Sequence, residues 1–177
     1  MNELALSSPR RFLLALALIV VAFPLRAADA PARATTLFVV RHAEKAPGDG
    51  DVPLSPVGRE RAALLARTLK DAQVTRVFTS QMARARETAT PLAEALKLTS
   101  EVVPAQDPDA LVTALRALPR GTTALIVGHS NTVPVIVERV AGTKVQPIAE
   151  DEFDRLLVLT IGDGSVTVTT LRYGPKP

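Results

Sequence analysis

Apolar runs alternate with helix-like segments along most of the chain. Short apolar or β-branched runs, bounded by polar, Gly or Pro residues, predict four buried strands at 37–40, 76–79, 98–103 and 123–127. Between these runs, apolar residues recur at three- and four-residue spacing, as they do on the buried face of a helix. Strands that alternate with helices are typical of βα units, so the sequence predicts an α/β fold with a largely parallel sheet.

Capping residues mark where two of the predicted helices begin. Ser55 before Pro56, and Asp107 before Pro108, each place a capping side chain ahead of a proline suited to the first turn. We expect the helix from Asp107 to end at Gly121. The predicted buried face of the helix from Ser55 is Leu64, Leu65, Thr68 and Leu69. A third helix, kinked or restarted at Pro91, should carry an apolar stripe of Met82, Ala85, Ala89, Leu92, Ala93 and Leu96.

The last part of the chain changes pattern. Residues 156–161 and 166–170 alternate Val with Thr in places and flank Gly162, Asp163 and Gly164. Two such runs around a Gly-rich turn predict a β-hairpin at the end of the fold.

Residues 1–28 have the pattern of a secretion signal. Arg10 and Arg11 precede an apolar run from residue 12 to residue 23, and small residues around Ala28 suit cleavage. A retained membrane anchor is the alternative, but this run falls short of the ~20 apolar residues that span a bilayer. We therefore expect residues 1–28 to be removed, residues 29–35 to form a linker, and residues 36–177 to fold as one domain. The mature protein would then be periplasmic or secreted, by the general or the twin-arginine route.

Composition narrows the range of partners. The hydrophobic content of 47% and the charged content of 22% are those of a folded protein. Without residues 1–28, which hold 3 of the 21 basic and 1 of the 18 acidic residues, 18 basic and 17 acidic residues remain. We therefore expect no nucleic-acid partner and no stable membrane insertion after signal cleavage. Since the chain has no Cys, disulfides and thiolate metal ligands are excluded. These features leave the oligomeric state open.

Both histidines of the chain fall directly beyond a predicted strand. His42 follows Arg41 at the end of the first strand, and His129 follows Gly128 at the end of the fourth. Ligands of open α/β sheets bind at the carboxyl ends of strands, so we expect the two histidines to face one crevice. The second strand delivers Thr79 and Ser80 to the same edge, and Arg84 and Arg86 come in the first turns of the next helix.

This group of side chains suits a phosphate. The planar guanidinium of arginine can bind two phosphoryl oxygens at once. Backbone N–H groups at a helix start, here around Ser130, Asn131 and Thr132, add further hydrogen-bond donors. Neighbouring arginines also disfavour a protonated imidazole, which makes His42 more available as a neutral nucleophile. A two-histidine metal site is the rival interpretation, but no Cys and no typical ligand spacing supports it.

Four motifs resemble those of the histidine phosphatase superfamily, which includes the cofactor-dependent phosphoglycerate mutases. They are Arg41-His42-Ala43-Glu44, the loop and helix start at 51–58, the Ser-xxx-Arg-Ala-x-Glu-Thr pattern of 80–88, and Gly128-His129-Ser130. Their order and approximate spacing also match, over roughly residues 36–140. The resemblance implies a phosphoglycerate mutase-like, three-layer α/β/α sandwich with a mostly parallel central sheet.

The resemblance also implies roles for individual residues. His42 would be transiently phosphorylated, and water would then hydrolyse the phosphohistidine. Arg41 and Arg84 would hold the phosphoryl oxygens, while His129 would donate a hydrogen bond to them as charge develops. The remaining substrate-binding candidates are Ser130 and Glu44. No metal and no organic cofactor is implied.

Two carboxylates are candidates for the proton donor to the leaving group. The family often takes it from a carboxylate after the third strand, where this chain offers Asp107, with Asp109 nearby. An Asp before Pro at a helix start can equally be a helix cap alone. Glu44, beside the nucleophile, is the second candidate.

Two departures from the family pattern bear on the site. Ala43 replaces the usual Gly, which should be tolerated unless that position needs a positive φ. Lys45 stands where a small polar residue is usual, so the substrate preference is expected to differ. We expect the loops at 46–52 and 105–109 to set specificity.

Other charged residues are interpreted as surface. The acidic run Glu150, Asp151, Glu152 and Asp154 is typical of a solvated loop before a strand. Arg59 and Arg61 are expected on the exposed side of their helix.

Several functions are compatible with these features. An exported phosphomonoester phosphatase fits best, and a phosphohistidine protein phosphatase fits the compact size but not the export signal. A mutase fits less well, because its substrate and bisphosphorylated primer are cytoplasmic. The alternative from another class is a non-catalytic protein that binds phosphate or another anion in the same pocket.

Overall fold

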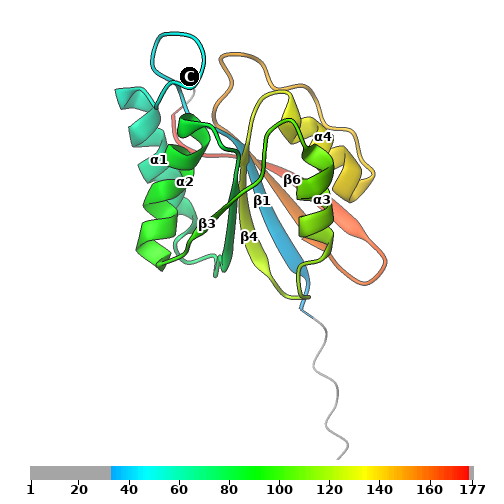
Figure 1. The fold of residues 1–177 in the computed structure, drawn as a ribbon. Helices are drawn as coiled ribbons and strands as arrows, with labels where there is room; N and C mark the ends of the chain where they lie inside the picture. The colour runs from blue at the N-terminus through cyan, green and yellow to red at the C-terminus, as the bar shows by residue number, and fades with distance from the viewer. Residues whose placement is uncertain (1–32, 176–177) are drawn as a thin grey trace, which may run out of the picture. The chain divides into compact units, whose positions relative to one another are not determined.

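The computed structural model describes residues 33–175, so the predicted signal sequence and most of the linker lie outside the described residues. Within this part the elements alternate as predicted (Figure 1). Their order is β1 (Thr35–Arg41), α1 (Pro56–Leu69), β2 (Arg76–Thr79), α2 (Ala83–Leu96), β3 (Ser100–Val102), α3 (Pro108–Arg116), β4 (Thr123–Gly128), α4 (Thr132–Ala141), β5 (Arg155–Ile161) and β6 (Val166–Arg172). No helix among residues 33–175 has the length and apolar character needed to cross a membrane.

The six strands form one mixed sheet in the order β3-β2-β4-β1-β5-β6. The four strands β1 to β4 pair in parallel, as the alternation of strands and helices predicts. The last two strands pair antiparallel to their neighbours and form the predicted hairpin, in which Ile161 lies opposite Val166. The α/β fold with a mostly parallel sheet is therefore confirmed.

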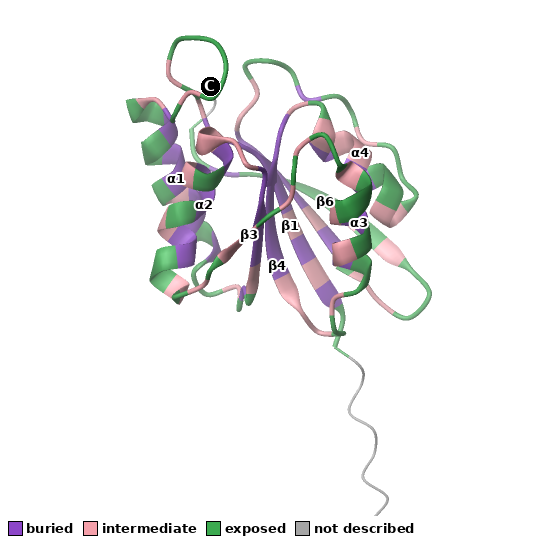
Figure 2. Cartoon of the chain, in the orientation of Figure 1, coloured by how far each residue is buried: buried purple, intermediate pink, exposed green. Residues whose placement is uncertain are grey.

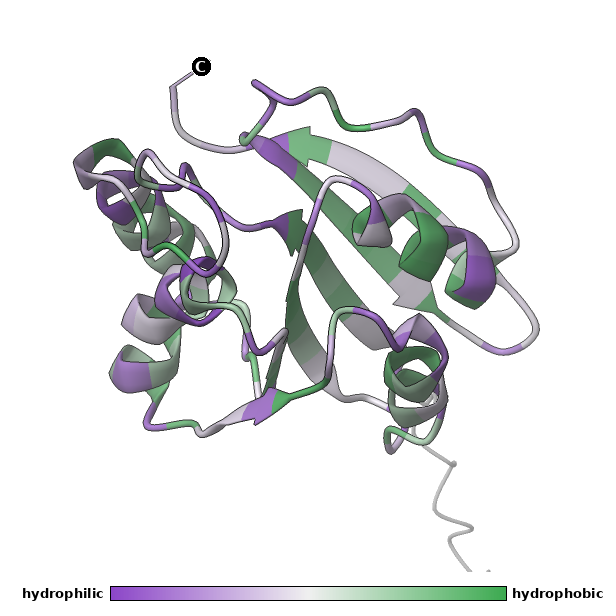
Figure 3. Cartoon of the chain, turned by 45° about the horizontal axis from the view of Figure 1, so that its top comes forward, coloured by the Kyte–Doolittle hydropathy of each residue, from purple (hydrophilic) through white to green (hydrophobic). Residues whose placement is uncertain are grey.

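Helices cover both faces of this sheet. Helices α1 and α2 lie on one face, and α3 and α4 lie on the other (Figure 1). The strand alternation sends successive side chains to opposite faces. Along β4, Leu125 and Val127 join the α1–α2 core, while Ala124 and Ile126 join the α3–α4 core. Burial and apolar character both concentrate on the strands and on the sheet-facing sides of the helices (Figures 2 and 3). This arrangement is the three-layer sandwich.

The buried face of α1 differs from the predicted one. Leu65 and Leu69 are buried as expected, but Thr68 is exposed and the buried stripe continues through Ala62 to Arg61. The expectation that Arg61 is exposed is wrong. Its guanidinium pairs with the carboxylate of Glu44, which the loop after β1 brings to this face of the helix. Arg59 is exposed, as predicted.

Three element boundaries also differ from expectation. Helix α2 is continuous through Pro91, so no restart occurs there; the packing of Ala89 and Leu92 on either side offsets the missing hydrogen bond. Helix α3 ends at Arg116, and Gly121, with a φ of +80°, lies in the turn before β4. Strand β3 is shorter than the predicted 98–103.

Candidate active site

Adjacent parallel strands place the two histidines side by side. Arg41 at the end of β1 lies opposite Gly128 at the end of β4, so His42 and His129 follow in register. The His42 N–H donates to the Gly128 carbonyl at 2.9 Å, and the two imidazole rings are 5.1 Å apart. The structure therefore brings both histidines to the one edge that the sequence predicts.

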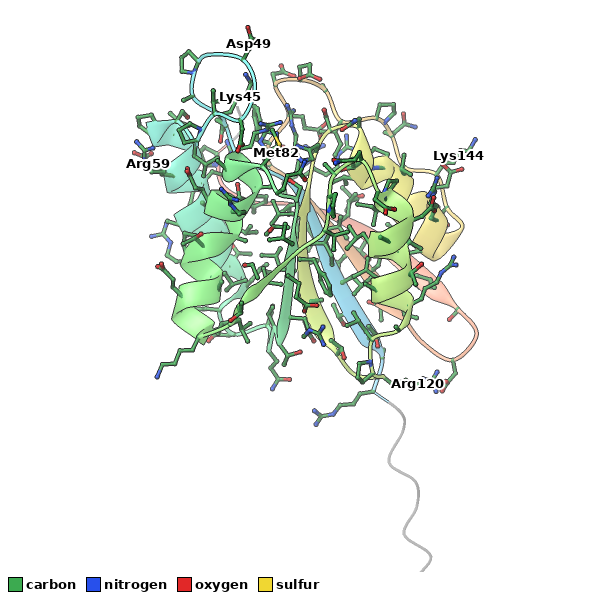
Figure 4. All side chains as sticks on the ribbon, in the orientation of Figure 1. Lys45, Asp49, Arg59, Met82, Arg120 and Lys144 are labelled. Atoms are coloured by element: carbon green, nitrogen blue, oxygen red, sulfur yellow. The ribbon has the colours of Figure 1, made fainter. Side chains whose placement is uncertain are left out.

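An open pocket of about 440 Å³ lies at this edge of the sheet. It is lined by Arg41, His42, Lys45, Met82, Arg84, Ala105, Gln106, His129, Ser130, Asn131, Thr132 and Glu150. Figure 4 shows Lys45 and Met82 at this end of the domain, with Arg120 at the opposite end. All of the predicted phosphate-binding side chains except Glu44 line the pocket, whereas Arg86 is exposed and does not.

Hydrogen bonds to both ring nitrogens orient His42. Its Nδ1 lies 2.7 Å from the Ala43 carbonyl oxygen, which can only accept, so Nδ1 carries the proton. The Nε2 lone pair consequently faces the pocket and accepts from Nε of Arg84 at 3.2 Å. Burial, and then the charges of His129, Arg41 and Arg84, lower the pKa of His42 to about 3. The ring is therefore neutral at ordinary pH, which a nitrogen nucleophile requires.

His129 is held by the end of β2 and by its own turn. Its Nε2 lies 2.9 Å from the Ser80 hydroxyl, and its backbone N–H donates to Oγ1 of Thr132 at 2.9 Å. Burial, followed by the charges of Arg84 and Arg41, lowers the pKa of this ring to about 4. A neutral His129 has a single N–H, and the Ser80 hydroxyl can either accept it at Nε2 or donate to an Nε2 lone pair. Ser80 therefore holds the ring of the second histidine in either tautomer.

The N–H groups expected to bind an anion at the start of α4 are partly used within the turn. The N–H groups of Thr132 and Val133 both donate to the His129 carbonyl. Ser130, Asn131 and Thr132 nevertheless line the pocket.

Arg41 is buried beneath the loop between α4 and β5. Its Nη1 donates to the carbonyl oxygens of Ala149, Glu150 and Glu152 at 2.7, 2.9 and 3.2 Å. Its Nη2 lies 3.3 Å from the Glu150 carboxylate, and the guanidinium stacks 4.2 Å from the centre of the Phe153 ring. Nη1 thus holds the loop, whereas Nη2 contacts the carboxylate of Glu150, which also lines the pocket.

The acidic run in this loop is only partly solvated. Glu150 and Asp151 are exposed, but the side chains of Glu152 and Asp154 are only 14% and 8% exposed. Glu152 pairs with Arg155 and Arg172, and Asp154 pairs with Arg172. The prediction of a solvated loop is therefore wrong for these two residues, because strands β5 and β6 supply arginines beneath it.

Arg84 connects the pocket to the loop at 46–52. Its Nη1 donates to the Gly50 carbonyl at 3.2 Å, and the Asp51 carboxylate accepts from the Ala83 N–H. Lys45 folds over the same loop, donating to the Gly48 carbonyl at 2.6 Å. The segment expected to set specificity is thus tied to the start of α2, which lines the pocket.

Neither predicted acid lies in the large pocket. The Asp107 carboxylate caps α3, accepting from the Ala110 N–H at 2.9 Å, and lines a separate cavity of about 20 Å³ beside His129. The Glu44 carboxylate is held by Arg61 through contacts of 2.8 to 3.0 Å. Asp109 pairs with Arg139. These positions favour structural roles for both predicted carboxylates.

Ala43 occupies its place without strain. It is fully buried, its N–H donates to Oγ1 of Thr88 at 2.9 Å, and its φ is not positive. The glycine that is usual at this position is therefore not needed for its backbone freedom.

Sequence reasoning missed three residues of the site region, namely Ser80 as a partner of His129, Arg61 as a partner of Glu44, and Glu150 as a pocket residue. Only Ser80 has a sequence signal, because it directly follows β2 at the edge where ligands bind. Among residues 33–175, no three His, Cys, Asp or Glu side chains gather in a way that could hold a metal ion.

Comparisons with known proteins give one matching family profile and several similar folds. The sequence profile of the histidine phosphatase superfamily (branch 1) matches residues 37–107. The fold is similar to that of the protein histidine phosphatase SixA in complex with tungstate, at 22% identity and a TM-score of 0.65, covering 77% of this chain and 96% of that one. It is also similar to that of a mycobacterial glucosyl-3-phosphoglycerate phosphatase, at 16% identity and a TM-score of 0.63, covering 80% and 100%. No curated protein matches the chain. At these identities the two structures show a shared fold.

Proposed function

Because the chain belongs to the histidine phosphatase superfamily, we propose that it is an exported phosphomonoester phosphatase that works through a phosphohistidine on His42. The observation that carries the proposal is the state of the His42 ring. Its Nδ1–H is fixed on the Ala43 carbonyl, and its Nε2 lone pair faces a pocket that two arginines and a second histidine line. A neutral imidazole in this orientation is a nucleophile aimed at a bound anion.

Arg84 supports a displacement step at this nitrogen. Its Nε–H now rests on the Nε2 lone pair of His42. A phosphoryl oxygen is a stronger acceptor than an imidazole nitrogen because it is charged, so substrate binding would draw this N–H away and free the lone pair. Nε2 then forms the N–P bond while the P–O bond to the leaving group breaks. Water attacks the phosphohistidine in the second step, and the N–P electron pair returns to Nε2.

Export is the part of the proposal that rests on residues 1–28 alone. A charged start followed by a short apolar run supports signal cleavage, and the near-balanced charge of the remaining chain suits a soluble enzyme acting on a small phosphorylated substrate. Mass spectrometry of the protein from a periplasmic fraction tests it. We expect an N-terminus near residue 29; a protein that retains Met1 would contradict export with cleavage.

The activity is tested by phosphate release from an aryl phosphate, with and without a chelator. We expect chelator-resistant turnover that is lost in His42→Ala. Arg84→Ala should lose most of the activity, and Arg86→Ala is the matched control, since it is two residues further along α2 and exposed. A fully active His42→Ala variant would contradict the mechanism. Saturable phosphate binding without turnover in the unaltered protein would favour the non-catalytic anion-binding alternative.

A protein phosphohistidine phosphatase is the second candidate. The observation that favours it is the fold similarity to SixA together with a pocket open enough to admit a side chain presented by another protein. Comparing kcat/KM for a phosphohistidine peptide and for small phosphomonoesters separates the two. We expect the esters to be preferred, and a strong preference for the peptide would establish the second candidate instead.

A further inference from the structure

Glu150 is the one carboxylate among the residues that line the large pocket. Its side chain is 90% exposed, and its two oxygens contact two different residues of the pocket wall. Oε2 lies 3.3 Å from Nη2 of Arg41, and Oε1 lies 3.5 Å from the Ser130 hydroxyl. A carboxylate so placed stands beside the position where Arg41 would hold a phosphoryl group.

From this placement we infer that Glu150 is the acid–base catalyst of the pocket, donating the proton to the leaving group and accepting one from the hydrolytic water. The inference rests on the proposed function. The carboxylates of Asp107 and Glu44 are each bound to a structural partner and lie outside the pocket lining. Glu150 is held instead by the Ser130 hydroxyl and by one arginine nitrogen that a phosphoryl group would take over.

Exchange of partners at Arg41 is what prepares Glu150 for proton transfer. Nη1 of Arg41 stays on the backbone carbonyls of the loop, so the guanidinium remains in place when Nη2 turns to a phosphoryl oxygen. The Glu150 carboxyl group is then released from Arg41 and stands beside the bound phosphoryl group. It is therefore free to contact the leaving-group oxygen only while a substrate occupies the pocket.

The two proton transfers balance over one turnover. In the first step the Nε2 lone pair of His42 bonds to phosphorus, the P–O electron pair leaves with the alcohol oxygen, and that oxygen takes the proton of the Glu150 carboxylic acid. In the second step the Glu150 carboxylate takes a proton from water as its oxygen bonds to phosphorus, and the N–P pair returns to Nε2. Glu150 ends protonated, as it began.

The test compares leaving groups of different quality in wild type and Glu150→Gln. Glutamine keeps the size of the side chain and an acceptor for Arg41 but cannot donate a carboxylic proton. With an alkyl phosphate we expect kcat/KM to fall by about 100-fold or more, within the usual range for a general acid. With p-nitrophenyl phosphate, whose leaving group needs no proton, formation of the phosphoenzyme should change by less than about 5-fold. Asp151→Asn, an exposed neighbour outside the pocket lining, is the matched control and should alter neither.

Three outcomes would overturn the assignment. If the rates with both substrates fell by the same factor, Glu150 would serve only as an ion-pair partner of Arg41 and not as an acid. In that case inorganic phosphate should also inhibit the variant more tightly. A leaving-group-dependent loss in Asp107→Asn instead would place the acid on α3. No loss in Glu150→Gln would exclude a catalytic role. In all three cases the wild type turns over, whereas a wild type without phosphohydrolase activity would contradict the proposed function itself.

Discussion

Replacing Arg61 by alanine should lower the free energy of unfolding by about 2 to 4 kcal/mol. The Arg61 side chain is 3% exposed and the Glu44 side chain 17% exposed, so the variant leaves a largely buried carboxylate without its cation. Breaking a buried pair in this way costs about 3–5 kcal/mol, and the partial exposure of Glu44 lowers the estimate. The carbonyls of Tyr173 and Pro175 also lose the donor that Nη1 supplies.

Urea unfolding followed by far-UV circular dichroism measures this loss, since the chain has no Trp and a single Tyr. Arg59→Ala, one half-turn away and exposed, is the control and should cost less than about 1 kcal/mol. A double-mutant cycle of Arg61→Met with Glu44→Gln should give a coupling of about 2 kcal/mol, because the two side chains are in direct contact. Equal costs for the two arginine variants, or no coupling in the cycle, would refute the claim that this ion pair supports the loop of His42.

The buried histidines, the close packing at Gly58 and the cap of α3 each have a measurable effect on stability. The pKa of His42 is about 3 and that of His129 about 4, against 6.5 for both when unfolded, so the unfolded chain binds more protons between these values. The contribution of both histidines to the free energy of unfolding should therefore be complete above pH 6.5 and be lost as the pH drops toward 4. NMR should show that neither imidazole titrates near pH 6.5, and a ring with a pKa near 6.5 in the folded protein would contradict this prediction. Gly58→Ala would place a Cβ 2.1 Å from the Glu44 carbonyl oxygen, so we expect lower stability by about 1–3 kcal/mol and a lower kcat; unchanged values in urea unfolding and kinetics would be inconsistent with that close approach. Asp107→Ala should lower the free energy of unfolding by about 1 kcal/mol, because it removes the side chain that caps α3. Thermal unfolding measures this loss, and an unchanged midpoint would show that the cap does not stabilise the protein.

The strand pattern of this sequence predicts the edge of the sheet where the site lies. Short apolar runs indicate β1, β2 and β4. The histidines directly after β1 and β4 line the pocket, and Ser80 after β2 contacts His129, because parallel neighbouring strands end at one edge. This inference needs only local sequence and a rule of topology. It therefore places His42, Ser80 and His129 together before any side-chain contact is known.

The contacts of the charged side chains could not be predicted in the same way. Arg61 and Glu44 are 17 residues apart and meet only because α1 packs on the loop after β1. Arg41 finds the carbonyls of the 149–152 loop more than a hundred residues away. A charge run such as 150–154 looks solvated unless the partners that bury it are known. Long-range pairing, which no local pattern encodes, is thus what separates the predicted site from the observed one.

Trapping of the phosphoenzyme shows whether His42 carries the phosphoryl group. The protein is mixed with a labelled phosphomonoester, quenched within milliseconds under alkaline conditions that preserve an N–P bond, and mapped by mass spectrometry. We predict one phosphoryl group per molecule, on His42, that is absent from His42→Ala and still formed, more slowly, in His129→Ala. A label on another residue, or undiminished turnover in His42→Ala, would exclude a phosphohistidine intermediate on His42.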